Sequence, residues 1–149
     1  MLWDTHMHCY FSGDSEATPR SMVESAIKKG LAGICFTDHQ DIDYREQPGL
    51  FDLDFPNYRN EILSLQEEYK NRIEICWGVE LGLQPHVVEE NLAIAHTYPF
   101  DFIINFSIAS FLSISSESNL ITQLYFEIVN KVLDVIYVPL LESIIKIRK

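Results

Sequence analysis

A chain of 149 residues fits one domain, and its 47% hydrophobic and 22% charged residues argue against disorder. The net charge of −11 disfavours nucleic acid as a partner, because the phosphate backbone would be repelled by such a surface. The three cysteines are widely spaced and indicate neither a disulfide framework nor a zinc ribbon, which fits a reducing, cytoplasmic compartment. We expect neither a signal peptide nor a membrane span, because no apolar run has the required flanks or length.

Apolar patterns of strand and helix type alternate along the first two thirds of the chain. The first helix has clear boundaries, with Thr18 as N-cap, Pro19 in the first helical position and Gly30 as C-cap. The predicted strands are 1–8, 31–37, 73–79 and 100–108, and the two further helices are 57–69 and 87–96. This alternation predicts βαβ units around a parallel sheet or barrel. A complete (β/α)₈ barrel needs about 250 residues, so the chain holds roughly half of one.

The sequence changes character beyond Ser110. A serine-rich loop is followed by an apolar pattern over 120–147, broken by Pro139. The pattern predicts one or two helices, or a helix and a strand at 132–138. We therefore divide the chain into a half-barrel, 1–108, and a divergent helical segment, 109–149.

Potential metal ligands stand at the ends of three predicted strands. His6 and His8 end the first strand, His39 follows the second, Glu80 follows the third, and Asp14 lies in a loop beside them. Sites in parallel α/β folds form at the carboxyl ends of strands, and residues two apart in a strand share a face. Taken singly, a histidine or glutamate at such a place is more often a solvated surface group. Together they favour a site for zinc, iron or manganese.

Four stretches of the sequence resemble the PHP superfamily of metal-dependent phosphoesterases, and in detail its histidinol-phosphatase branch. They are 4–8 (DTHMH), 11–15 (FSGDS), 36–39 (FTDH) and 78–86 (GVELGLQPH). The resemblance covers residues 1–104, and the last stretch is the most specific to the branch.

The resemblance implies a partial PHP-type (β/α)₇ barrel with up to three divalent ions. It implies that His6 and His8 bind the first ion, that Glu80 bridges the first and second, and that Asp14 and His39 bind the third. A metal-bound hydroxide would then attack the phosphorus of a small phosphate ester. No catalytic residue beyond these ligands is implied, and the residues that bind substrate stay unassigned.

The sequence departs from the family pattern after residue 104. The fourth strand of the family normally ends in Gly-Ser-x-His, but the matching stretch here is Asn-Phe-Ser-Ile, with Ile108 in place of a ligand of the second ion. No histidine follows His96, so the ligands of later strands are also absent. His86 and His96 lie near predicted helices, and histidines at such places are more often surface groups than substitute ligands. A frameshift, a deletion or a gene fragment would each explain the departure.

Three functions stay open at this point. The first is a histidinol-phosphatase of histidine biosynthesis, the second is a metal-binding remnant without turnover, and the third is a PHP phosphoesterase of another substrate. A PHP nuclease is disfavoured by the negative charge. The loss at Ile108 predicts little or no activity.

Four strands cannot close a barrel, so self-association through an open sheet edge is expected. An apolar stripe could instead cover that edge: Leu120, Leu124, Ile128 and Val132.

Overall fold

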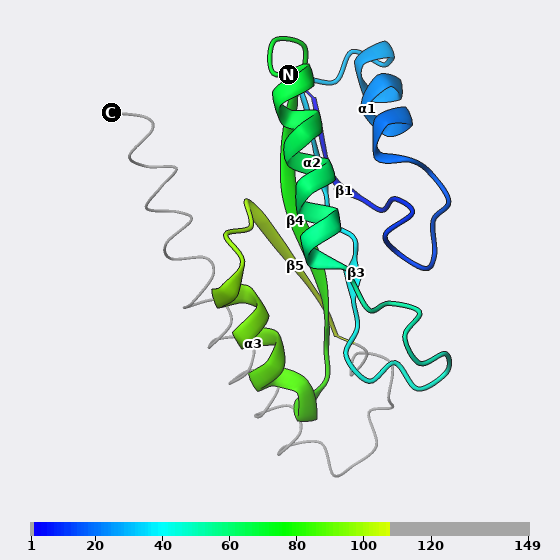
Figure 1. The fold of residues 1–149 in the computed structure, drawn as a ribbon, viewed down its shortest axis with the longest axis vertical. Coiled ribbons are helices and arrows are strands. Elements are labelled where there is room, and N and C mark those ends of the chain that lie inside the picture. Colours follow the sequence, from blue (N-terminus) through cyan, green and yellow to red (C-terminus); the bar gives the residue numbers. More distant parts are fainter. Residues whose placement is uncertain (1, 108–149) are drawn as a thin grey trace.

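The computed structural model describes residues 2–107, which form a parallel sheet with helices between its strands (Figure 1). The elements in chain order are β1 (Trp3–Met7), α1 (Pro19–Lys28), β2 (Gly33–Phe36), β3 (His39–Gln40), α2 (Phe55–Tyr69), β4 (Glu74–Leu83), a 3₁₀ turn η1 (Pro85–Val87), α3 (Val88–Thr97) and β5 (Phe102–Ser107). All strand pairings are parallel. The α/β class predicted from the sequence is therefore confirmed.

The sheet is centred on β4. On one edge β4 pairs with β2 and then with β3, and on the other edge it pairs with β5; β1 lies beyond β2. The short β3 continues the line of β2 along β4 after a break at Thr37 and Asp38. The side chains of both residues at this break are fully buried.

Several predicted boundaries were wrong and the short β3 was not predicted, and two of the differences have a clear physical reason. The third strand, expected to end at Val79, runs on to Leu83, because β5 pairs with it from Gly78 onward. Helix α2, expected from Asn57, begins at Phe55, because the Asp54 side chain accepts a hydrogen bond from the Asn57 backbone N–H and caps the helix. The first helix begins at Pro19 as predicted.

Alternation along β4 separates the hydrophobic core from the opposite face of the sheet. Ile75, Trp77, Val79 and Leu81 belong to a core on the helix-covered face. The same core includes residues of α1 and α2: Val23, Ala26, Tyr58, Ile62 and Leu65. Glu80 lies between two of these core positions and therefore projects from the other face. The helices bury apolar surface on one side and leave the other side for polar chemistry.

Some predictions fall outside the described residues. They concern Ile108, the segment 109–149 and its apolar stripe. Among residues 2–107, no helix combines the length and apolar character needed to cross a membrane.

A buried tyrosine ties α2 to the sheet and provides a test of this packing. The Tyr58 hydroxyl donates to the Gly78 carbonyl at 2.9 Å, and both residues are buried. We expect Tyr58→Phe to lower the free energy of unfolding by about 1 kcal/mol, the usual net worth of one hydrogen bond. The matched control is Tyr44→Phe, because the Tyr44 hydroxyl donates to Glu46 at the surface. Urea unfolding of both variants checks this, and equal effects would contradict it.

Candidate metal centre

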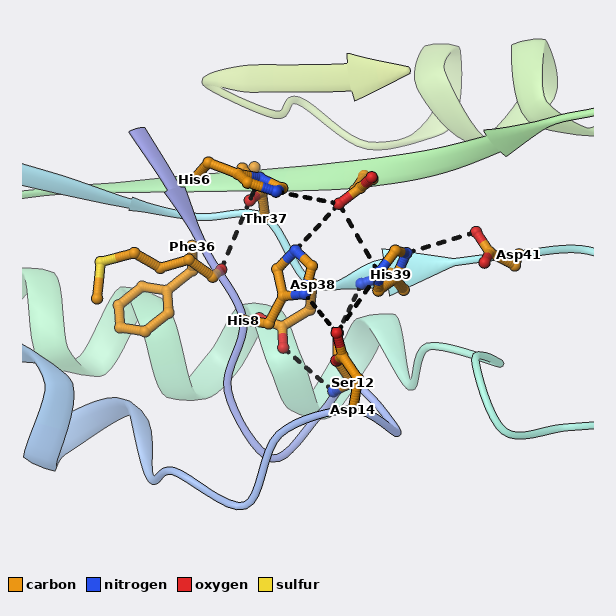
Figure 2. Close-up of polar contacts among 12 residues, drawn as sticks. His6, His8, Ser12, Asp14, Phe36, Thr37, Asp38, His39 and Asp41 are labelled. Carbon is orange, nitrogen blue, oxygen red and sulfur yellow. Dashed lines mark hydrogen bonds and ion pairs between the residues drawn. The ribbon is translucent and has the colours of Figure 1, made fainter. Parts of the chain in front are cut away.

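The five predicted ligands come together on the polar side of the sheet (Figure 2). The Glu80 carboxylate is their centre, and its Oε2 lies 3.0 Å from His8 Nε2, 3.5 Å from His6 Nε2 and 3.8 Å from His39 Nε2. Glu80 is buried within β4, opposite His39 in the parallel register. Three imidazoles from two different parts of the chain thus surround one buried carboxylate oxygen.

Asp14 forms a second focus beside the first. Its Oδ2 lies 2.9 Å from His8 Nδ1 and 3.6 Å from His39 Nε2. His8 consequently lies between two carboxylates and offers one ring nitrogen to each. Two groups result, His6 with His8 and Glu80, and His8 with Asp14 and His39; in each, one ligand atom per residue lies within 4.8 Å of the others.

An irregularity in β1 contributes to this placement. The register passes from Asp4 opposite Ile34 to Met7 opposite Phe36, so β1 carries one more residue than β2 between these pairs. Such bulges re-aim side chains and are frequent beside functional sites. His8 itself lies one residue beyond β1. Strict strand alternation, the basis on which His6 and His8 were predicted to share a face, therefore does not explain their meeting.

Two polar residues that the sequence analysis did not single out lie beside the second ring nitrogens of His6 and His39. Thr37 is fully buried, and its Oγ1 lies 2.9 Å from His6 Nδ1, which leaves His6 Nε2 facing Glu80. Asp41 faces His39, with Oδ1 at 3.6 Å from Nδ1, just beyond hydrogen-bond distance. His39 Nδ1 and Asp41 Oδ1 are both buried, and neither has a hydrogen-bond partner in the described part of the chain.

This arrangement fits a metal centre. Histidines that bind metals usually hydrogen-bond through their second ring nitrogen to a carboxylate or another oxygen, which fixes the ring. Thr37 stands in that position for His6 and Asp41 for His39. The mixed imidazole and carboxylate donors suit zinc, iron or manganese. His86 and His96 belong to neither group; both are exposed, and His86 pairs with Asp43 at 3.0 Å.

The cluster is held by opposite charges. The hydrogen bond to Glu80, helped by Asp14 and opposed by burial, raises the pKa of His8 to about 9. Burial alone would raise the pKa of Glu80, but the hydrogen bond from His8 and the nearby charges of His39 and His6 lower it. Burial alone would also raise the pKa of Asp14, but the hydrogen bond and charge of His8, together with the charge of His39, lower it. A cation that binds here must therefore displace a proton from His8.

Comparison with known proteins assigns the chain to a family. Residues 4–137 match the PHP domain family. The chain belongs to this family. The match continues past residue 108, and the division of the chain at that point stays a prediction.

Relatives and a solved structure agree with this assignment. The chain is 43% identical over 102 residues to the histidinol-phosphatase of Lactococcus lactis subsp. lactis strain IL1403, covering 68% of this chain and 37% of that protein. It is 29% identical over 103 residues to the histidinol-phosphatase of Bacillus subtilis strain 168, covering 64% and 38%. A crystal structure of the L. lactis histidinol phosphate phosphatase with zinc, L-histidinol and phosphate matches with a TM-score of 0.64 at 43% identity, covering 69% of this chain and 38% of that one. The PHP-type barrel is thus partial: the chain spans less than two fifths of these relatives.

The raised pKa of His8 gives a prediction about pH. Below pH 6.5 its charged pairing contributes fully to the stability of the metal-free chain, and this contribution is lost as pH rises through about 9. Asp14 and Glu80 have lowered pKa values, so they stabilise the fold at pH values above their unfolded pKa values. This stability is lost as the pH falls through their folded pKa values. Metal affinity should show the opposite dependence on pH. It should weaken about tenfold per pH unit as the pH falls below about 9, because metal binding displaces one proton from His8.

Thermal melts with and without Mn²⁺ between pH 6 and pH 9 measure both trends. The control variant is His96→Ala, which removes an exposed histidine outside the cluster and should keep the parent's profile. A metal-induced shift of the melting temperature that is the same at both ends of the range would contradict the prediction.

Proposed function

We propose that this chain carries the metal-binding part of a histidinol-phosphatase, a phosphoric monoester hydrolase that converts L-histidinol phosphate and water to L-histidinol and phosphate. One observation supports this most: five imidazole and carboxylate ligands converge in a PHP chain that is 43% identical to a histidinol-phosphatase. The zinc, L-histidinol and phosphate in the L. lactis structure suggest the same chemistry here. The thiols of Cys9 and Cys35 are free and buried, which suits the cytoplasm that we propose as its compartment.

The residues divide the tasks of such a site among them. His6, His8 and Glu80 would hold one divalent ion, with Glu80 shared toward a second, and Asp14 and His39 would hold a third. Such ions lower the pKa of water and stabilise charge on a transferred phosphoryl group. Zinc, iron and manganese all suit these donors.

The exposure of the cluster supports one direction of approach for a substrate. The His6 and Asp14 side chains are 50% and 41% exposed, whereas His8 and His39 are 16% exposed and Glu80 is 6% exposed. A small phosphate ester would therefore approach from the side of His6 and Asp14. Thr37 and Asp41 lie behind the rings of His6 and His39 and would keep them oriented during the approach.

A second candidate is a PHP protein that binds metal but turns over little or nothing. The sequence favours it at one point: Ile108 takes the place of an expected ligand. Two-metal hydrolysis requires both the attacking and the leaving oxygen to be stabilised, so a missing ion should reduce the rate strongly. A PHP phosphoesterase of another substrate is the third alternative.

Two variants of β4 test the proposal. Glu80→Gln removes the central carboxylate, and Glu74→Gln makes the same change at an exposed position near the start of that strand. We expect the parent and Glu74→Gln to bind metal and to release phosphate weakly from L-histidinol phosphate. Glu80→Gln should lose bound metal and at least about 100-fold of the phosphate release, the range seen when one electrostatic contact to the reacting group is removed.

Elemental analysis and a phosphate assay on the purified chain measure the two effects. Metal binding without any phosphate release would favour the second candidate. Release from other phosphate esters but not from L-histidinol phosphate would favour the third. A parent chain without bound metal would contradict all three.

We also propose that the chain self-associates. Within residues 2–107, β1 and β5 are outer strands, and each has one edge without a partner strand. Such edges pair readily with other chains. Sedimentation velocity should show dimers or larger species that increase with concentration, and a monodisperse monomer across the concentration range would contradict this.

A further inference from the structure

We propose that Asp38, which precedes the ligand His39 in the chain, is the positioning residue that fixes His8 and Asp14 relative to His39. The inference rests on the proposed metal centre and deepens it. Asp38 faces away from the cluster and belongs to neither ligand group. Its task would be to hold the loop that carries two of the ligands.

Within residues 2–107, the hydrogen bonds of the Asp38 side chain all go to one short loop. Its side chain is fully buried, and its Oδ1 accepts hydrogen bonds from the Cys9 N–H at 2.8 Å and the Ser12 N–H at 3.1 Å. The Cys9 thiol donates to Oδ2 at 3.1 Å. These donors lie in the turn that separates His8 from Asp14, so one carboxylate fixes the loop between two ligands.

The loop holds His39 in return. Ser12 is also buried, and its Oγ accepts a hydrogen bond from the His39 backbone N–H at 2.7 Å (Figure 2). Asp38 and Ser12 therefore form a reciprocal latch: each residue binds the backbone of the segment that carries the other. The latch joins His8 and Asp14 on one side to His39 on the other.

Backbone bonds anchor the latch to the sheet. The Glu80 N–H donates to the Asp38 carbonyl at 3.0 Å, and the Thr37 N–H donates to the Met7 carbonyl at 2.8 Å. Asp38 is therefore fixed relative to β4 and β1 by its main chain, while its side chain is free to hold the loop. His6 and Glu80 are held by the sheet itself, whereas Asp14, and His8, which belongs to both groups, depend on the latch.

This difference separates a positioning role from a general contribution to folding. A buried carboxylate that only stabilised the fold would weaken all metal binding together with the melting temperature. A positioning residue would weaken the Asp14 and His39 group and spare His6 and Glu80. Removing a residue that supports metal ligands commonly costs about 10- to 100-fold in metal affinity.

The test compares Asp38→Ala with Asp101→Ala in the full chain. An asparagine at 38 would keep the Oδ1 that accepts the Cys9 and Ser12 N–H bonds, so the side-chain acceptor is removed altogether. Asp101 also accepts a backbone hydrogen bond, from the Trp77 N–H at 2.9 Å, but it belongs to neither ligand group. Mn²⁺ titrations followed by calorimetry give affinity and stoichiometry. We expect Asp38→Ala to bind one ion fewer than the parent, or to bind it about 10- to 100-fold more weakly, and to keep the remaining affinity. Asp101→Ala should bind as the parent does.

Hydrogen exchange provides a readout that needs no metal. Asp38→Ala should speed exchange of the amides of 9–14 and leave those of β4 unchanged. Parent-like binding and exchange, or a uniform loss of all binding and protection, would overturn the proposal. If Asp38→Ala does not fold, Ser12→Ala decides: it removes the acceptor for the His39 N–H, and parent-like exchange of the amide of 39 together with parent-like Mn²⁺ binding would overturn the proposal.

The outcome is independent of the proposed activity. A latch that controls metal binding in a chain that releases no phosphate would support the positioning role and contradict the phosphatase. If the parent bound no metal, the metal centre would fail, and hydrogen exchange would still decide whether Asp38 fixes the loop.

Discussion

The buried carboxylate of Glu80 is the interaction on which the arrangement of the site depends. A carboxylate inside a sheet is strongly destabilising unless it is paired and hydrogen-bonded. Three imidazoles lie within 3.8 Å of its Oε2, and the parallel register brings one of them, His39, directly opposite. The break between β2 and β3 and the bulge of β1 each bring a histidine into that range. Glycines on both sides of Glu80 leave the necessary space: a Cβ on Gly82 would lie 2.4 Å from Asp41 Oδ1, and one on Gly78 would lie 2.6 Å from a backbone oxygen of β5.

The sequence was sufficient to predict the parallel α/β class and the five converging side chains, for a physical reason. His6, His39 and Glu80 follow apolar runs, and the carboxyl ends of parallel strands meet at one edge of a sheet. The end of β4 could not be predicted in this way, because its last residues extend only through pairing with β5, a contact between distant parts of the chain. The bulge in β1 is likewise a property of two strands together.

The supporting residues were missed for a related reason. Thr37 and Asp38 follow a buried strand, where threonine suits the strand and aspartate suits a turn, so each has an ordinary local explanation. Their contacts run to His6 and to the Cys9 turn, about thirty positions earlier in the chain. Asp41 lies in a stretch that composition predicts as loop. No local pattern distinguishes these residues from neighbours without such contacts; only the FTDH stretch, through its family resemblance, drew attention to the segment.

The charge balance of the cluster explains how such a site can assemble without its ions. With a pKa of about 9, His8 is protonated at neutral pH, and it lies between the two carboxylates that a cation would otherwise neutralise. The proton thus takes part of the role of the metal, and the ligands are already close together when an ion arrives. All five ligands precede residue 81, so the geometry needs only the first four parallel strand segments and the loops between them. A chain that spans less than two fifths of its relatives can therefore contain a preassembled cluster of candidate metal ligands.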